Sequence, residues 1–135
     1  MRKNKKFPGR FESLEPISRF VRQAAEDAGL DEMSVYSVEL AVDEACSNII
    51  EHAYGAEGKG EIECSCIIED DGLTIVIKDK GNPFDPDTVP EVNTQQPLED
   101  RKPGGAGVFL MRKVMDMVRF EFTPKGNVLT MKKNK

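Results

Sequence analysis

The sequence predicts an α+β fold in which helices cover one face of a β-sheet, and three observations carry this prediction. Before residue 55, two stretches place apolar residues at steps of three and four, the period of an amphipathic helix. From Gly60 to Asp79 the period changes to two, which is the pattern of strands with one buried face. A long stretch with neither period follows, and then one more helical pattern and two more strand patterns.

Composition indicates a single domain over residues 1–135. A chain of 135 residues with 39% hydrophobic and 32% charged residues can bury a core and keep a polar surface. The net charge of −5 argues against non-specific nucleic-acid binding. No apolar run reaches the roughly 18 residues of a membrane span, and the basic start is not followed by an apolar signal-peptide core. We therefore expect a cytoplasmic protein with no membrane or direct nucleic-acid partner.

The three cysteines do not have the spacing of a zinc site. Cys46 belongs to a helical stretch, whereas Cys64 and Cys66 share one face of an expected strand, and His52 is the only histidine. Zinc ligands usually occur as spaced Cys or His pairs. We interpret the three cysteines as reduced structural thiols, as in most cytoplasmic proteins.

A short strand within Arg2–Phe11 and one amphipathic helix are expected first. Ser13 is the expected N-cap of this helix, Pro16 is tolerated in its first turn, and Gly29 follows its end near Ala28. Its expected core face consists of Ile17, Phe20, Val21, Ala24 and Ala28.

The second helix, over Ser34–Tyr54 with its start at Asp31 or Ser34, organises the rest of the chain. Its apolar stripe consists of Val38, Val42, Ala45, Ile49 and Ala53. Glu44 and Asn48 are four residues apart, so they are expected to face outward, away from that stripe. A carboxylate and an amide on an exposed helix face can be ordinary solvated polarity, and the residues of this helix alone leave that interpretation open.

The later elements are expected to be strands around one more helix. An antiparallel hairpin turns at Asp70-Asp71-Gly72 and ends at Asp79. Gly81–Gly105 is rich in proline and has no period, as is typical of a lid or binding loop. A helix is expected over Gly107–Met117, followed by two strands joined around Pro124-Lys125-Gly126.

Three stretches could together form a nucleotide site. They are the Glu44 and Asn48 pair, Asp79-Lys80-Gly81 at a strand end, and Gly104-Gly105-Ala106-Gly107 leading into a helix. Glycines at a helix start let backbone N–H groups approach phosphate oxygens. No Walker A motif is present, and each stretch alone is also typical of an ordinary turn or helix surface.

In combination and in this order, the three stretches closely resemble the boxes of the Bergerat-fold (GHKL) ATPases. Glu44-Ala-Cys-Ser-Asn48 looks like the N-box, Asp79-Lys80-Gly81 like the first glycine box, and Gly105-Ala-Gly107-Val-Phe-Leu110 like the second. Within that superfamily the chain is most similar to the small bacterial anti-sigma-factor serine-protein kinases, over about Phe11–Lys133. The resemblance implies a two-layer α/β sandwich with a mixed, mostly antiparallel sheet and helices on one face.

The resemblance also implies roles for individual residues. Glu44 would be the catalytic base for a serine hydroxyl of a protein substrate, and Asn48 would hold Mg²⁺ on the ATP phosphates. Asp79 would bind the adenine amino group, with Gly81 allowing close approach. The remaining nucleotide-binding residues would be Gly105, Gly107 and Val108, with residues 82–106 as the ATP lid. Many relatives have a threonine after the last hairpin glycine to help bind adenine, whereas here Asn127 follows Gly126.

The implied function is an ATP-dependent serine-protein kinase that also sequesters a sigma factor. Its substrate would be a STAS-type anti-anti-sigma protein, Arg19 would contact a partner, and the protein would form a homodimer. The alternative is a non-catalytic nucleotide-binding or protein-interaction module of the same fold, which would not need Glu44. A sensor histidine kinase is disfavoured, since no dimerisation helix with a phosphoacceptor histidine precedes the domain.

Overall fold

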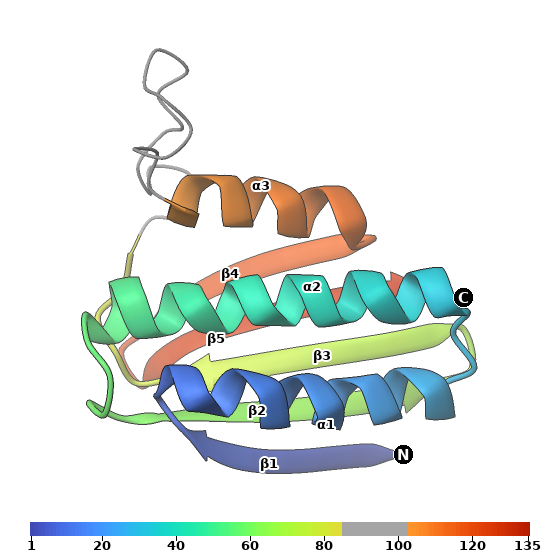
Figure 1. Ribbon diagram of the computed structural model, residues 1–135, viewed down its shortest axis with the longest axis horizontal. Helices are drawn as coiled ribbons and strands as arrows, with labels where there is room; N and C mark the ends of the chain where they lie inside the picture. The colour runs from blue at the N-terminus through green and yellow to red at the C-terminus, as the bar shows by residue number, and fades with distance from the viewer. Residues whose placement is uncertain (85–102) are drawn as a thin grey trace.

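Three α-helices cover one face of a five-stranded sheet in the computed structural model, and none of the described helices lies on the other face (Figure 1). The structure describes residues 1–84 and 103–135, without the side chains of residues 103–107. The strands are β1 (Arg2–Pro8), β2 (Glu61–Glu69), β3 (Gly72–Asp79), β4 (Met117–Thr123) and β5 (Gly126–Asn134). The helices are α1 (Leu14–Asp27), α2 (Glu32–Asn48) and α3 (Pro103–Val114), with a 3₁₀ turn η1 (Phe11–Ser13) and a π-helical segment η2 (Ile49–Tyr54).

The sheet is antiparallel at every pairing between the described strands. Its order is β1-β2-β3-β5-β4, and each of the four neighbouring pairs runs antiparallel. The two-layer α+β prediction is therefore confirmed, but the expected mixed sheet is not: the residues that the structure describes contribute no parallel pair. Both hairpins use two-residue turns, Asp70-Asp71 and Pro124-Lys125, as the sequence predicts.

The first helix follows the prediction except at its start. α1 ends at Asp27, and Gly29 has φ +80°, a left-handed conformation that stops the helix. Ser13 directly precedes α1, but its side chain makes no capping hydrogen bond. The reason is that η1 already holds Ser13 in a helical conformation, whereas an N-cap side chain bonds from an extended one.

The second helix lies centrally among the helices (Figure 1) and carries the predicted apolar stripe. Its N-cap is Asp31, whose carboxylate accepts a hydrogen bond from the Ser34 N–H at 2.8 Å. At Ile49 the helix continues as η2, which ends at Gly55 (φ +80°). The stripe residues are all buried, with no side chain more than 4% exposed: Val38, Val42, Ala45, Ile49 and Ala53.

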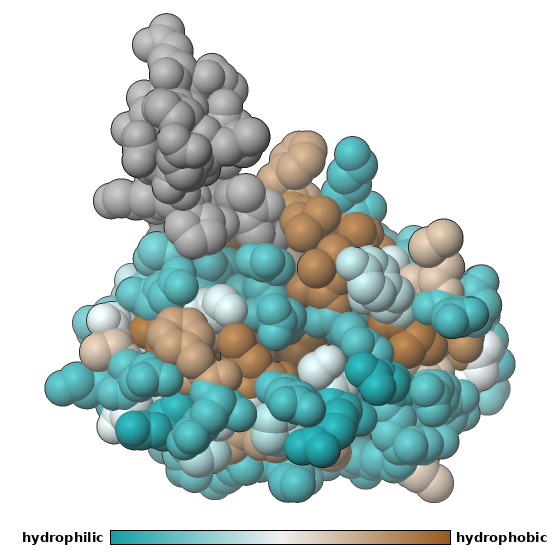
Figure 2. All heavy atoms as spheres, in the orientation of Figure 1, coloured by the Kyte–Doolittle hydropathy of each residue, from teal (hydrophilic) through white to brown (hydrophobic). Residues whose placement is uncertain are grey.

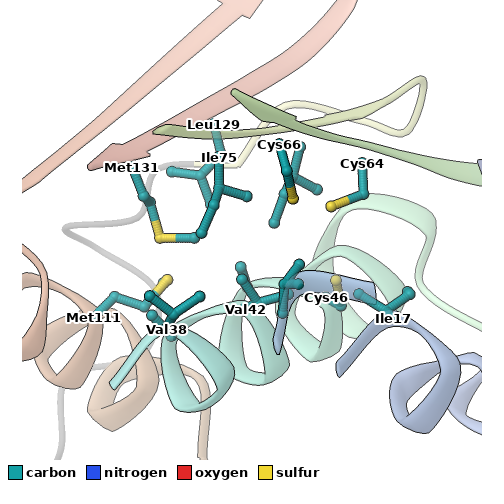
Figure 3. Close-up of a cluster of buried hydrophobic side chains, with 14 of the residues drawn as sticks. Ile17, Val38, Val42, Cys46, Cys64, Cys66, Ile75, Met111, Leu129 and Met131 are labelled. Atoms are coloured by element: carbon teal, nitrogen blue, oxygen red, sulfur yellow. The ribbon is translucent and has the colours of Figure 1, made fainter. Parts of the chain in front are cut away.

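The core lies between α2 and the inward face of the sheet (Figure 3). Cys46 of α2 and Cys64 and Cys66 of β2 are buried and unpaired within it. Burial raises the pKa of the Cys46 thiol to about 12, so this thiol stays protonated and unreactive at neutral pH. The interpretation of the cysteines as reduced structural thiols therefore holds.

The third helix begins earlier and ends earlier than the sequence predicts. It starts at Pro103 and ends at Val114, whereas Met117 is already the first residue of β4. Proline favours the first position of a helix, and Val108, Met111 and Met115 anchor this part of the chain in the core. Figure 2 shows hydrophobic atoms gathered on the surface over α3, where Phe109 is 68% exposed.

Candidate nucleotide-binding site

The predicted site residues come from elements that meet at one end of the sandwich. The C-terminal end of α2, the last residues of β3 and the start of α3 lie at this end (Figure 1). Ala45, Asn48, Asp79 and Asn127 line a common cleft there. The fold therefore brings the N-box residue Asn48 and the first-glycine-box residue Asp79 together, although they are far apart in the sequence.

Asp79, the last residue of β3, is held in a fixed orientation. Its carboxylate Oδ1 accepts hydrogen bonds from the Gly81 N–H at 2.9 Å and from Asn127 Nδ2 at 2.8 Å. Burial raises the pKa of this carboxyl group, and the two hydrogen bonds partly oppose that shift. The other oxygen, Oδ2, accepts no hydrogen bond from the described residues, which leaves it free to accept one from a ligand.

Gly81 is required by packing around the end of the long helix. A Cβ atom on Gly81 would lie 2.6 Å from the carbonyl carbon and oxygen of Ala53, so only glycine fits. The next residue, Asn82, donates its N–H to the Ala53 carbonyl at 2.7 Å. These contacts fix the end of β3 against η2, and they do so independently of any ligand.

Asn48 is buried rather than outward-facing, which corrects the sequence expectation. Its side chain is only 2% exposed, and its Nδ2 has no hydrogen-bond partner among the residues that the structure describes. Helical periodicity distinguishes the face toward the sheet from the opposite face, but α2 has other neighbours that also bury its surface. An unpaired buried amide costs about 1–3 kcal/mol, so such a group marks a place where a ligand or water is expected.

Glu44 lies one helical turn before Asn48 and is half-buried. Its pKa is raised, mainly by desolvation and also by the negative charges of Asp43 and Glu51. It forms no ion pair or hydrogen bond within the part of the chain that the structure describes. A carboxylate with increased proton affinity and no protein partner is suited to accept a proton.

The second glycine box lies inside α3 rather than in a loop before it, which is a further correction. Gly105 and Gly107 follow the helix start at Pro103. The first N–H groups of a helix have no partner within the helix, so a phosphate could still bind them. Val108 is 4% exposed in the core, so only its backbone could contact a nucleotide. Most of the expected lid lies outside the described residues.

Residues 7–133 match a family model described as a histidine kinase-like ATPase domain. Serine-protein kinase RsbW of Halalkalibacterium halodurans is 32% identical over 130 residues, which is 93% of this chain and 78% of that protein. This chain belongs to the RsbW family of histidine kinase-like ATPase domains. The resemblance inferred from the three boxes is thereby confirmed, and membership of an ATPase-domain family implies ATP binding.

A second RsbW relative agrees with this assignment, and one solved structure agrees with the fold. Serine-protein kinase RsbW of Bacillus subtilis is 28% identical over 120 residues, or 86% of this chain and 75% of that protein. A crystal structure of the RsbU and RsbW domains of a Mycobacterium tuberculosis protein has a TM-score of 0.71 at 14% identity. It covers 99% of this chain and 32% of that longer chain, and this likeness supports the fold alone.

Two features of this RsbW-family site have no counterpart in the sequence prediction. Asn127 lies opposite Asp79 in the β3–β5 register and donates to its carboxylate at 2.8 Å. A polar residue at an inward position of β5, before Leu129 and Met131, is the signal that could have indicated this role. Phe84, just after Gly81, also lines the cleft beside Asn48 and Asp79.

The described structure contains no metal cage and no membrane span. Within the described part of the chain, no three His, Cys, Asp or Glu side chains cluster closely enough to hold a metal ion. None of the helices in residues 1–84 and 103–135 has the length and hydropathy of a membrane-spanning segment.

Arg19, the expected partner residue, is exposed on α1 and does not line the cleft.

Proposed function

We propose that this RsbW-family protein is an ATP-dependent serine-protein kinase that also acts as an anti-sigma factor. Its substrate is a STAS-type anti-anti-sigma protein, and its second partner is a sigma factor. The observation that carries the proposal is the buried amide of Asn48, whose nitrogen has no partner in the described part of the chain and which shares a cleft with the oriented carboxylate of Asp79. The RsbW relatives named serine-protein kinases support the same activity.

The adenine end of the nucleotide would bind at Asp79. Gly81 and Asn127 occupy one carboxylate oxygen, so the adenine amino group would donate to the other. At the phosphate end, the N–H of Gly105 lies in the first turn of α3 and would face the phosphate oxygens, where the positive end of the α3 dipole favours an anion. Gly107 and Val108 follow in the second turn, so their N–H groups would reach a phosphate only if the start of α3 unwound.

Asn48 would hold Mg²⁺ together with the ATP phosphates. The oxygen and nitrogen of an amide exchange places when the group rotates by 180°, so the unpartnered end of Asn48 can present an oxygen, the ligand type that Mg²⁺ prefers. When bound, Mg²⁺ would neutralise phosphate charge that develops during transfer.

Glu44 would accept the proton of the substrate serine. The serine oxygen forms a bond to the γ-phosphorus, the bond to the oxygen that bridges the β- and γ-phosphates breaks, and ADP leaves with that oxygen. The serine proton moves to the Glu44 carboxylate, whose raised pKa increases its affinity for this proton. Most of the remaining catalysis would come from positioning and charge neutralisation.

The partners would bind outside the cleft. Arg19, exposed on α1, would contact a partner protein, and two copies of the chain would form a homodimer in the cytoplasm. Phosphorylation of the STAS-type protein would prevent it from binding, so the sigma factor would stay captured.

Calorimetric titration with Mg²⁺·ADP and Mg²⁺·ATP tests the nucleotide site. Asn48→Ala should weaken binding roughly tenfold or more, equivalent to about 1.4 kcal/mol. It should not destabilise the fold strongly, because the amide nitrogen that it removes has no partner. The control Asn134→Ala removes an exposed amide at the end of β5 and should bind normally. Equal affinities in all three proteins would remove Asn48 from the site.

A non-catalytic module is the second candidate, and the packing of the cleft favours its form as a protein-interaction module that binds no nucleotide. The cavity between Asn48, Asp79 and the surrounding aromatic rings measures only about 10 Å³. Phosphate transfer from ATP to a purified STAS-domain protein distinguishes the two candidates. Nucleotide binding without transfer would leave the protein as a nucleotide-dependent binding module.

A further inference from the structure

The ring of Phe84 fills the cleft in which Asp79 and Asn48 meet. Its centroid lies 5.7 Å from the Phe122 ring and 6.4 Å from the Phe120 ring, both in edge-to-face geometry. On its other side it lies 5.9 Å from the His52 ring. Phe84 therefore bridges the end of the long helix and strand β4 across the cleft opening.

With Phe84 in this position, the cleft cannot admit a nucleotide base. Its remaining volume is about 10 Å³, at or below the space that a single water molecule needs. The residues around that volume include Asn48, Asp79 and Asn127. A purine could reach Asp79 through this cleft only after the Phe84 ring had left.

With the Phe84 ring in the cleft, two buried polar groups have no partner among the described residues, which is unusual for a stable protein interior. Asn48 Nδ2 and His52 Nε2 are both buried, and neither has a hydrogen-bond partner within residues 1–84 and the described atoms of 103–135. Buried polar groups in stable interiors are almost always paired, and each unpaired group costs about 1–3 kcal/mol. The ring contacts of Phe84 thus stabilise a state that the unpaired groups of Asn48 and His52 destabilise.

The backbone before Phe84 is anchored, whereas Phe84 itself is not. Asn82 donates its N–H to Ala53 at 2.7 Å and accepts from Asn127 Nδ2 at 3.3 Å. Counting only partners in the described part of the chain, the backbone of Phe84 makes no hydrogen bond. The ring can therefore leave the cleft while Asp79, Gly81 and Asn82 keep their positions.

We propose that Phe84 is an autoinhibitory plug that competes with the nucleotide base for the space between Asp79 and Asn48. This inference rests on the proposed nucleotide site. Binding then requires the ring to move out, and the apparent dissociation constant equals the intrinsic one divided by the fraction of open molecules. If about one molecule in ten is open, removing the plug strengthens binding by about tenfold.

Phe84→Ala tests the plug against an ordinary packing role. The plug predicts that Mg²⁺·ADP binds Phe84→Ala up to about tenfold more tightly than the wild type, although the variant is less stable. Phe20→Ala is the matched control, because Phe20 is also partly buried and forms an edge-to-face contact with Phe7, at 6.0 Å. This control should lose stability and keep the wild-type affinity.

A tryptophan at position 84 reports the movement directly. The chain contains no tryptophan, so Phe84→Trp gives a protein with a single emission source. Its emission should shift to longer wavelength as Mg²⁺·ADP is added, with the same midpoint as calorimetric binding. Phe20→Trp should show no such shift.

Each outcome of these titrations supports or overturns the plug role of Phe84, and the outcomes also distinguish it from the proposed function. Wild-type binding with equal or weaker affinity in Phe84→Ala overturns the plug and leaves the proposed function standing. Binding by Phe84→Ala alone supports both. Absence of binding in the wild type and in Phe84→Ala, even at millimolar nucleotide, overturns the proposed function and the plug together.

Discussion

The two ends of the long central helix differ in how their polar groups are satisfied. At the N-terminal end, the Asp31 carboxylate caps the helix, and Glu39 accepts a hydrogen bond from Arg22 Nη2 at 3.1 Å. At the C-terminal end, Asn48 Nδ2 and His52 Nε2 are buried, and no described residue pairs with either of them. Both ends belong to one continuous helical stretch, so helix formation alone does not account for the difference.

The contrast separates polar groups that are paired with protein from buried polar groups that have no partner in the described part of the chain. Polar groups at the first end are paired with protein, as stability requires. Those at the second end are buried at a cost and point to a ligand. The following variants test this comparison, from the largest expected effect to the smallest.

Glu44→Gln should lower phosphate transfer to a STAS-domain protein by roughly 10²–10⁴-fold, the range typical of a lost general base. Nucleotide affinity should change little, since the proposed role concerns the serine proton. Glu39→Gln, at a paired carboxylate nearer the N-terminal end, is the control and should keep full activity. Full activity in Glu44→Gln would assign the proton to another group.

Asp79→Asn should weaken ADP binding by roughly 10–100-fold, because a carboxylate that accepts a hydrogen bond contributes about 1.5–3 kcal/mol. The same variant should melt at a higher temperature than the wild type at neutral pH. The pKa of Asp79 is raised in the folded state, so its contribution to stability falls as pH rises from 3.8, the ordinary value, through the folded value.

The gain in melting temperature from Asp79→Asn should therefore disappear when the pH falls below the ordinary value of the carboxyl group. Thermal melts of both proteins across the acid range measure this directly. A gain that is independent of pH would show that burial of the charge is not its cause.

Asp31→Ala should lower the free energy of unfolding by about 1 kcal/mol, the usual effect of losing an N-cap. Urea unfolding measures this change, and nucleotide affinity of the folded protein should stay the same. A change in affinity would show that the two ends of the helix are coupled, contrary to the comparison.

Glu51→Gln should have the smallest effect, a shift of the acid limb of the transfer rate to lower pH. The negative charge of Glu51 helps to raise the pKa of Glu44. Without it Glu44 loses its proton at lower pH, so activity should persist further into the acid range. A pH–rate profile tests this, and a shift to higher pH would contradict the assigned electrostatics.

Periodicity was sufficient for most of the fold because it reports burial on one face of each element. The stripe from Val38 to Ala53 and the alternation along β2 and β3 correspond directly to the core. The start of α3 was missed because Pro103 lies at the end of a proline-rich stretch that resembles a loop. The burial of Asn48 was missed because one helix pattern cannot show how many neighbours surround a helix.

The candidate site was predictable in its parts but not in its geometry. Glu44, Asn48 and Asp79 are predicted site residues because their boxes resemble those of a known family, and their roles stay predictions. The hydrogen bond from Asn127 to Asp79 depends on the register between β3 and β5, which no local pattern contains. The packing of Phe84 depends on rings from β4 and η2, so it too required the assembled fold.

The positions of the two chain ends have a practical consequence. The Met1 amino group donates to the Ile68 carbonyl, and the Lys135 N–H donates to Asp71, so both ends lie beside the β2–β3 turn. Figure 1 shows them at the end of the sheet opposite the C-terminal end of α2, whose residues Ala45 and Asn48 line the cleft. Affinity tags, surface tethers or fused domains can therefore be attached at either end, and we expect them to leave the nucleotide entrance unobstructed.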